Sequence, residues 1–157
     1  MNIFFLDKDP LRASSMYGDK HVGKLIVEVA QMCSTALHRH GLHDEAPYKS
    51  AYEKHPMTIW VGDTGGNFYW SLRLLDELLN QYEKRYKKIH KSKKIYKLLS
   101  TTYNKWHTLK PNITPPPQCM PDEYKHKDYI TAYKQYYVGE KKRFAKYTGV
   151  DTPDFMC

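Results

Sequence analysis

With 157 residues, 41% of them hydrophobic and 27% charged, the chain is long enough for one globular domain with its own core. No apolar run approaches the ~18 residues that cross a bilayer, and three widely spaced cysteines without a CxxC pair argue against a disulfide framework or a cysteine zinc site. The net charge of +8 and the 14 tyrosines favour a polyanionic partner, because lysines hold phosphates while aromatic rings stack on bases. We expect DNA, in double-stranded form, although a basic surface that only aids solubility gives the same composition.

Residues 1–157 are expected to form a single all-α domain, a compact helical bundle that begins with a short extended segment. The apolar run NIFFL at residues 2–6 is too short to distinguish a strand from an extended entry. Asp7 and Asp9 follow at once, which argues against a signal peptide. We therefore expect a monomer in the cytoplasm, or in the host cytoplasm if the chain is viral, without a membrane partner.

The sequence predicts two helices in its first quarter. Pro10 can occupy the first position of a short helix through Tyr17. A longer helix should follow over residues 19–40, with Asp19 as its N-cap and Gly41 as the residue that closes it. One face of this helix is an apolar stripe, because hydrophobic side chains recur at steps of three and four. They are Val22, Leu25, Val29, Met32 and Ala36.

A second stripe of the same helix is polar and chemically mixed. His21, Lys24, Glu28, Gln31 and Thr35 recur at the same steps, about 100° around the helix axis from the apolar stripe. One interpretation is the wet side of an ordinary amphipathic helix. An imidazole, an ammonium group, a carboxylate and an amide in line also suit acid–base chemistry, so the alternative is a reactive row.

Histidines gather where this helix ends. His38, His40 and His43 match no strong zinc spacing, so we expect a solvent-exposed helix end without a metal. No pattern in the chain indicates a cofactor. Residues 44–56 should form a loop, in which the following proline holds His55 extended. Trp60, four residues after that proline, is expected to anchor this segment in the core.

A second long helix is predicted over residues 67–89, after the turn signal of residues 63–66. Its buried face again steps by three and four. That face comprises Phe68, Leu72, Leu75, Leu79, Tyr82 and Tyr86. We expect the two long helices, 19–40 and 67–89, to run antiparallel and to cross through their apolar stripes.

The end of this second helix is strongly basic, and the basic residues continue into the next segment. A short helix should cover residues 93–103, a proline-rich stretch at 108–121 should cross the surface, and a last helix should cover 128–147. Lysines alternating with tyrosines suit nucleic acid, although a lysine-rich helix can be simply solvated. The residues expected to contact nucleic acid are Lys20, Gln31, Arg85, Lys87, Lys88, Lys91, Lys94, Tyr133, Lys134 and Tyr137.

Three segments resemble one family. They are D-K-H-V-G-K-x-x-V-E-x-x-Q at residues 19–31, H-P-x-x-x-W at 55–60, and E-x-R-Y at 83–86. Together they are similar to the small pyrimidine-dimer DNA glycosylases of the endonuclease V type, and to short uncharacterised phage proteins that begin M-N-I-F. The similarity covers roughly residues 15–90 through moderately specific motifs, and A-Y-K-Q-Y-Y-V-G-E-K at 132–141 resembles the family's tyrosine-rich tail.

The resemblance implies a mostly helical glycosylase that also cleaves the backbone at the resulting abasic site. The implied nucleophile is the chain's own α-amine, assisted by a glutamate of the first long helix, which corresponds to Glu28. An α-amine suits this work because its pKa near 8 leaves a neutral fraction able to form an imine with the sugar carbon. The family exposes a small residue after methionine removal, whereas bulky Asn2 should protect Met1 here. We therefore expect the amine to belong to Met1.

Three classes of function remain open on the sequence. The first is this glycosylase and lyase, acting on damaged or modified pyrimidines. The second is a DNA- or RNA-binding accessory protein without chemistry. The third is an enzyme acting on a free nucleotide or modified base through His21, Lys24, Glu28 and His55. A glutamate beside a lysine is more often a helix ion pair than an acid–base couple, so the position of the Met1 amine relative to Glu28 is informative.

Overall fold

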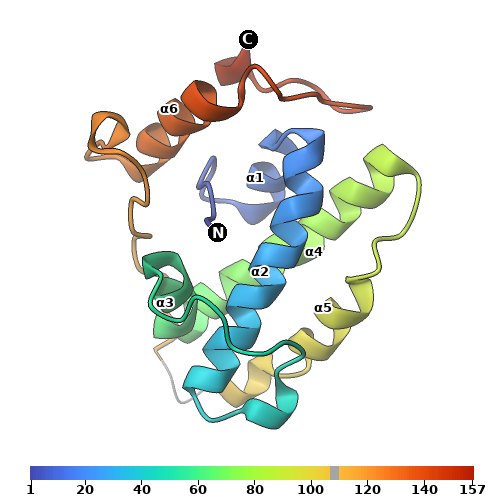
Figure 1. Cartoon of the computed structure of the whole chain (residues 1–157), viewed down its shortest axis with the longest axis vertical. Helices are drawn as coiled ribbons and strands as arrows, with labels where there is room; N and C mark the ends of the chain where they lie inside the picture. The colour runs from blue at the N-terminus through green and yellow to red at the C-terminus, as the bar shows by residue number, and fades with distance from the viewer. Residues whose placement is uncertain (107–109) are drawn as a thin grey trace.

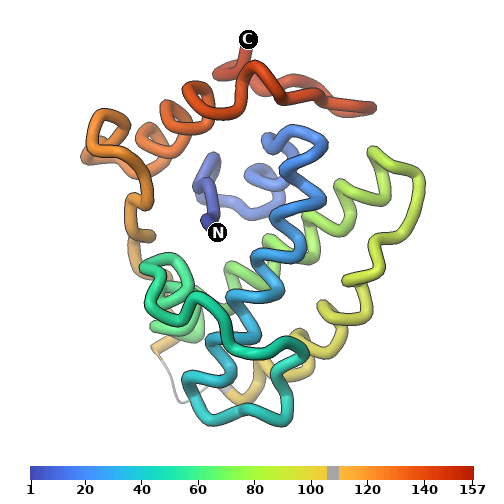
Figure 2. Tube along the Cα trace, viewed as in Figure 1, coloured from blue at the N-terminus to red at the C-terminus, as the bar shows by residue number. Residues whose placement is uncertain are grey.

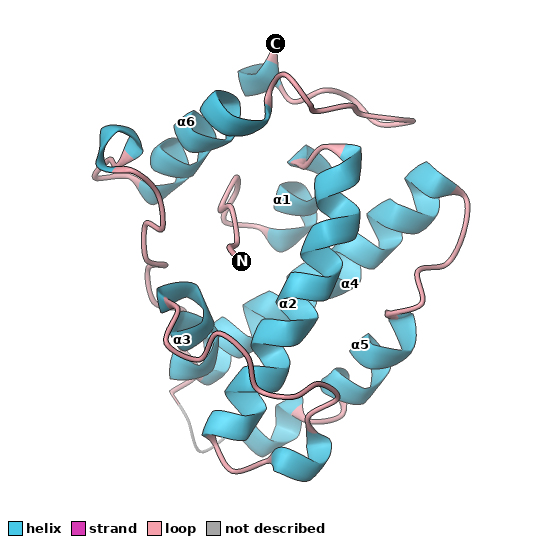
Figure 3. Cartoon of the chain, in the orientation of Figure 1, coloured by secondary structure: helices cyan, strands magenta, loops and turns pink. Residues whose placement is uncertain are grey.

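A computed structural model describes residues 1–106 and 110–157 of the chain (Figures 1 and 2). Within these residues every regular element is helical, and no strand is present (Figure 3). The α-helices are α1 (Pro10–Met16), α2 (Asp19–Arg39), α3 (Pro56–Asp63), α4 (Gly65–Tyr86), α5 (Lys93–Ser100) and α6 (Tyr129–Lys141). The predicted all-α fold is confirmed. No helix of the described chain is both long and apolar enough to cross a membrane.

Helices α2 and α4 run antiparallel and cross at the centre of the molecule, as predicted (Figure 1). The predicted apolar stripe of α2 is buried along its whole length, and so are the leucines and Phe68 of α4. Tyr86 departs from the prediction because it lies on the last turn of α4 with 39% of its surface exposed. These two stripes form the centre of the core, and burial of such side chains contributes about 1.5–3 kcal/mol each.

Several helix ends differ from the predicted ones. Gly18, not Asp19, is the N-cap of α2. Helix α4 begins at Gly65, where the Thr64 hydroxyl accepts from the Asn67 N–H at 2.9 Å, and it stops at Tyr86 because Lys87 adopts a left-handed conformation with φ of 58°. Helix α5 ends at Ser100 and α6 at Lys141, so both are shorter than the predicted 93–103 and 128–147.

The first residues of the chain are part of the core and not a loose entry. Ile3, Phe4, Phe5 and Leu6 are each at most 6% exposed. This extended segment lies between α6 and the crossing helices (Figure 2), where Phe4 stacks on Tyr136 of α6 with ring centroids 5.0 Å apart. Phe5 stacks on Trp70 of α4 at 4.5 Å and also contacts the rings of Tyr129 and Tyr133 of α6. Helix α6 is therefore joined to the other helices through aromatic side chains of the N-terminal segment.

The proline-rich stretch is fastened to the start of α4. The described part, residues 110–121, lacks regular structure up to residue 119, as its prolines require; residues 108 and 109 lie outside the described chain. The Gly65 N–H donates to the Lys110 carbonyl at 2.9 Å, and Trp60 Nε1 donates to the Thr114 carbonyl at 2.9 Å. Trp60 itself is 3% exposed, so it anchors α3 in the core as predicted.

Candidate active site

The N-terminal amine and Glu28 lie together on the surface of α2. The Met1 nitrogen is 3.9 Å from Glu28 Oε1, and Lys24 Nζ is also 3.9 Å from the same oxygen. The side chains of Met1 and Glu28 are 8% and 17% exposed, whereas Lys24 is 66% exposed. Both distances exceed hydrogen-bonding range, so the contacts are ion pairs that leave the carboxylate lone pairs free to accept from a ligand.

The position of this amine follows from the residues after it. Burial of Ile3–Leu6 directs the preceding two residues along α2. The Asn2 amide then fixes the terminus from both sides, since its Nδ2 donates to the Cys119 carbonyl at 2.9 Å while its Oδ1 accepts from the Ile3 N–H at 2.9 Å. Asn2 is therefore a positioning residue for the amine, which no motif in the sequence indicated.

His55 approaches the same pair from the start of α3. Its Nδ1 accepts from the Met57 N–H at 3.1 Å, so the imidazole is the N-cap of α3. Burial and the positive Met1 amine lower the pKa of His55, and the Glu28 carboxylate opposes them. Because Nδ1 is an acceptor in the neutral ring, Nε2 carries the proton. In this tautomer His55 is a hydrogen-bond donor to a neighbouring oxygen and not a proton acceptor.

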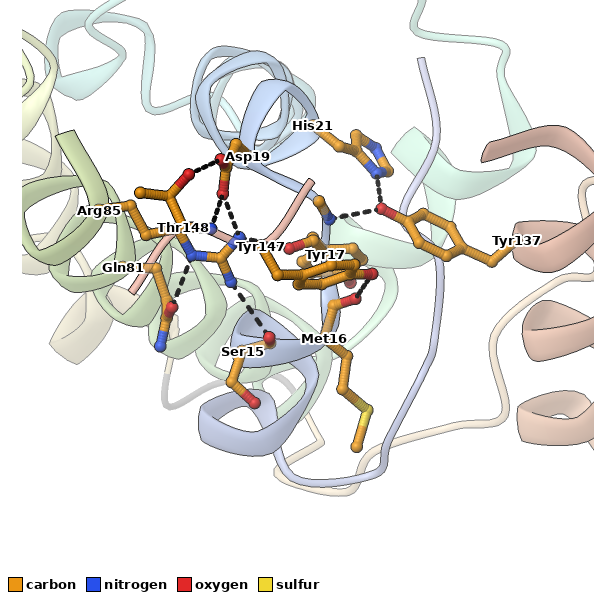
Figure 4. Close-up of polar contacts among 11 residues, drawn as sticks. Ser15, Met16, Tyr17, Asp19, His21, Gln81, Arg85, Tyr137, Tyr147 and Thr148 are labelled. Carbon is orange, nitrogen blue, oxygen red and sulfur yellow. Dashed lines mark hydrogen bonds and ion pairs between the residues drawn. The ribbon is translucent and has the colours of Figure 1, made fainter. Parts of the chain in front are cut away.

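His21 occupies a separate, aromatic environment. The Tyr137 hydroxyl accepts from the Gly18 N–H at 2.9 Å and lies 3.1 Å from His21 Nδ1 (Figure 4). The hydroxyl proton is then donated to Nδ1, which places the imidazole proton on Nε2. Burial, Lys141 and Lys24 lower the pKa of His21 to about 3, so the ring is neutral at physiological pH. Seven residues at 1.5 Å each separate His21 from Glu28 by about 10 Å along α2, too far to act on one atom.

The remaining part of the polar stripe of α2 holds a loop. Gln31 Nε2 donates to the Lys49 carbonyl at 2.6 Å, and the Thr35 hydroxyl both donates to the Ala51 carbonyl at 3.1 Å and accepts from the Ala51 N–H at 3.0 Å. Gln31 therefore has a structural role, and its contact with nucleic acid stays a prediction. The polar stripe is therefore neither only solvent-exposed nor a single reactive site. Lys24 and Glu28 lie near the amine, whereas Gln31 and Thr35 hold the loop that carries His55.

Three residues predicted to contact nucleic acid are instead buried. Tyr133 and Tyr137 are 0% exposed, and the Arg85 side chain is likewise 0% exposed. Tyr133 donates to the Pro117 carbonyl at 2.6 Å and fixes the proline-rich segment. Since these side chains have their partners inside the protein, they are not available as the exposed contacts to nucleic acid that the sequence predicted. Tyr133 and Tyr137 are four residues apart, which is the spacing of a buried helix face and was the available signal.

Arg85 joins three parts of the chain at the start of α2 (Figure 4). Its guanidinium donates to the Tyr17 carbonyl at 2.6 Å, to the Ser15 carbonyl at 3.1 Å and to Asp19 Oδ1 at 3.2 Å. Thr148 donates to the same carboxylate at 2.6 Å. Burial acts to raise the pKa of Asp19, but the bonds from Thr148 and Arg85 lower it. Asp19 therefore binds the C-terminal arm to α4 and does not cap α2.

The other predicted lysines remain available to a partner. Lys20, Lys87, Lys88, Lys91 and Lys94 are all exposed. Lys134 is half-buried, and its ammonium group lies 5.2 Å from the centre of the Phe155 ring. The contact between Arg85 and Asp19 places the basic end of α4 beside the first turn of α2. The end of α4 therefore lies near the helix turn that carries Lys20.

The cluster of histidines near residue 40 is used within the protein. His38 Nε2 donates to the Tyr48 carbonyl at 2.9 Å, and His38 Nδ1 lies 2.8 Å from His43 Nδ1. His40 Nε2 donates to the Gly62 carbonyl at 2.7 Å. Within residues 1–106 and 110–157, no group of three or more His, Cys, Asp or Glu is arranged to hold a metal ion.

Comparison with protein-family models, with curated proteins and with solved structures found no match for the chain.

Proposed function

We propose that the protein is a DNA glycosylase and abasic-site lyase that acts on damaged or modified pyrimidines through an imine with the Met1 α-amine. The observation that carries the proposal is the 3.9 Å separation of the Met1 nitrogen and Glu28 Oε1. It agrees with the motif resemblance, in which the corresponding glutamate assists an α-amine. The net charge of +8 and the exposed lysines of α4 and α5 supply the attraction to a polyanion.

The residues of the site have distinct roles in this reaction. The neutral amine attacks the sugar C1′ while the bond to the base breaks, and the base leaves with the bonding electrons and takes up a proton. Glu28 accepts a proton from the amine and returns it to O4′ as the C1′–O4′ bond breaks, and the opened sugar is left as a protonated imine. Loss of a C2′ proton expels the 3′ phosphate and cuts the strand, after which water hydrolyses the imine. Lys24 and the Nε2–H of His55 stabilise the oxygen atoms that gain negative charge.

The direct test is to trap the imine. The protein is incubated with duplexes that contain an abasic site or a pyrimidine dimer, and borohydride is added. The imine is reduced to a stable amine, so a covalent protein–DNA adduct whose cross-linked peptide begins at Met1 is the expected result. Absence of an adduct with both duplexes, together with salt-dependent binding, would instead establish a binding protein without chemistry.

A variant separates the role of Glu28 from that of the amine. Glu28→Gln keeps the side-chain shape but removes the proton acceptor, so turnover should fall by about 10²–10⁴-fold. DNA affinity should hold or rise, because a negative charge that faces phosphates has been removed. Glu53→Gln is the matched control, since Glu53 is exposed on the neighbouring loop. A Glu28→Gln protein that cleaves like the parent would remove Glu28 from the mechanism.

A further inference from the structure

A hollow separate from the amine lies where α2 begins and where the chain leaves α6. Its volume is about 190 Å³, and its lining includes Lys20, His21, Lys24, Tyr137, Lys141 and Phe144. Phe144, which is 62% exposed, forms an outer wall. Tyr137 and His21 stack on one another with ring centroids 5.5 Å apart and form the inner wall. The hollow is thus built by two helices distant in sequence.

The lining of this hollow is strongly positive. Three lysines, at positions 20, 24 and 141, are among the lining residues, which include no carboxylate, and Lys24 also forms the ion pair with Glu28. Burial lowers the pKa of His21, and Lys141 and Lys24 act in the same direction, as positive charges beside the imidazole do. Such an accumulation of like charge in a concave site favours an anionic ligand.

Hydrogen-bond donors without a protein acceptor accompany the positive charge. The backbone N–H groups of Lys20 and His21, in the first turn of α2, have no acceptor in the described chain, and Gly18 has no side chain that could cap them. His21 uses Nδ1 for Tyr137, and its Nε2–H has no acceptor there either. These donors belong to separate backbone and side-chain groups, so the helix terminus is one contributor among several.

We propose that this hollow binds a single phosphate group. The oxygens of a phosphate group can accept from several N–H donors and ammonium groups at once. The hollow is smaller than the about 300–1,000 Å³ of sites for whole small molecules, so it holds a phosphate with part of its sugar. This phosphate belongs to the DNA strand that is cut, an assignment that rests on the proposed function. The hollow lies about 10 Å along α2 from Glu28.

The first test uses inorganic phosphate with the full-length protein. Backbone amide signals of residues 20 and 21 should shift and saturate on titration with phosphate at constant ionic strength. Lys20→Ala and Lys141→Ala should each weaken this binding by tenfold or more. Lys142→Ala is the matched control, since Lys142 is exposed, does not line the hollow, and should change the affinity by less than twofold. Equal shifts with chloride, or equal affinity in all three variants, would overturn the phosphate site.

The second test uses a duplex with an abasic site. Lys141→Ala should lower its affinity and reduce the slope of log K against log salt by about 1, whereas borohydride trapping at saturating DNA should persist. If inorganic phosphate binds the parent at this hollow but Lys141→Ala keeps the duplex affinity of the parent, the site does not hold a phosphate of the DNA strand. Phosphate binding without a covalent adduct would contradict the proposed glycosylase function and leave the phosphate site standing. An adduct without phosphate binding would overturn the hollow as a site and leave the glycosylase intact.

Discussion

The neutral state of His21 makes the stability of the fold depend on pH. The folded protein lowers the pKa of His21 from its ordinary 6.5 to about 3, first through burial and then through Lys141 and Lys24. Above pH 6.5 the ring is neutral in both the folded and the unfolded state, and its contribution to stability is fully present. As the pH falls below 6.5, the unfolded chain takes up a proton that the folded protein refuses, so stability is lost until the pH reaches about 3.

The size of the effect follows from the width of this window. Each pH unit costs about 1.4 kcal/mol of unfolding free energy for one proton. Between pH 6.5 and 4.5 the loss from His21 should therefore be up to about 3 kcal/mol. His55 and His90, whose pKa values are also lowered by burial, act in the same direction. A variant at His21 is needed to isolate its share.

The measurement compares the parent with His21→Asn, whose side-chain oxygen can replace Nδ1 as the acceptor for Tyr137. Urea unfolding is followed at pH steps from 7.5 to 4.5 by near-ultraviolet circular dichroism, which reports the packed tyrosines. The variant should be less stable at pH 7.5 and should lose less stability on acidification. His126→Asn, at an exposed histidine, should keep the slope of the parent. If the unfolding free energy depends on pH in the same way in the parent and in His21→Asn, then His21 is not the buried, neutral imidazole inferred here.

Three further outcomes follow from contacts in the fold. Gly66→Ala should destabilise the protein by about 1–3 kcal/mol in thermal or urea unfolding, because the new Cβ would lie 2.4 Å from the backbone oxygen of Pro111. Gly139→Ala is the control. Its Cβ would also lie 2.4 Å from another atom, but that atom is the hydroxyl at the end of the Tyr124 side chain, which can move, so the loss of stability should be smaller. Thr35→Val should cost about 1–3 kcal/mol and speed amide hydrogen exchange at Ala51, since it removes both hydrogen bonds to that residue, whereas Ser50→Ala on the same loop should change neither. A variant with alanine at Lys87, Lys88, Lys91 and Lys94 should bind duplex DNA with a flatter salt dependence, and an unchanged salt slope would leave these exposed lysines as a solvated face.

Periodicity predicted the centre of this fold well, because hydrophobic spacing determines which face of a helix is buried. The apolar stripes of α2 and α4, the anchoring Trp60 and the antiparallel crossing all follow from local patterns. The ends of helices follow less directly, since they depend on partners elsewhere in the chain. Aspartate is a common N-cap residue, but the Asp19 carboxylate instead accepts hydrogen bonds from Arg85 and Thr148, which lie 66 and 129 residues away in the sequence.

The candidate site could be predicted only in part for the same reason. Glu28 and Lys24 share a helix face, so their spacing was enough to indicate that they lie together. The approach of Met1 depends on burial of Ile3–Leu6 and on the Asn2 hydrogen bond to Cys119, which no local pattern encodes. Arg85 lies in a basic stretch, where net charge favours an exposed side chain. Its burial is possible because the Ser15 and Tyr17 carbonyls at the end of α1 and the Asp19 carboxylate accept from it.

The long-range fastening of α6 has a consequence for how the chain is made. The hydrogen bonds between the last third of the chain and residues 2–21 span 116 to 131 positions. At about 5–20 residues per second, the ribosome needs about 6–23 s to add the 117 residues that separate Asn2 from Cys119. During that interval Phe4 and Tyr17 lack the rings of α6 that cover them, and the nascent chain offers apolar surface to chaperones. A polypeptide terminated before residue 129 would keep that surface uncovered, and it would become a substrate for the cell's proteases.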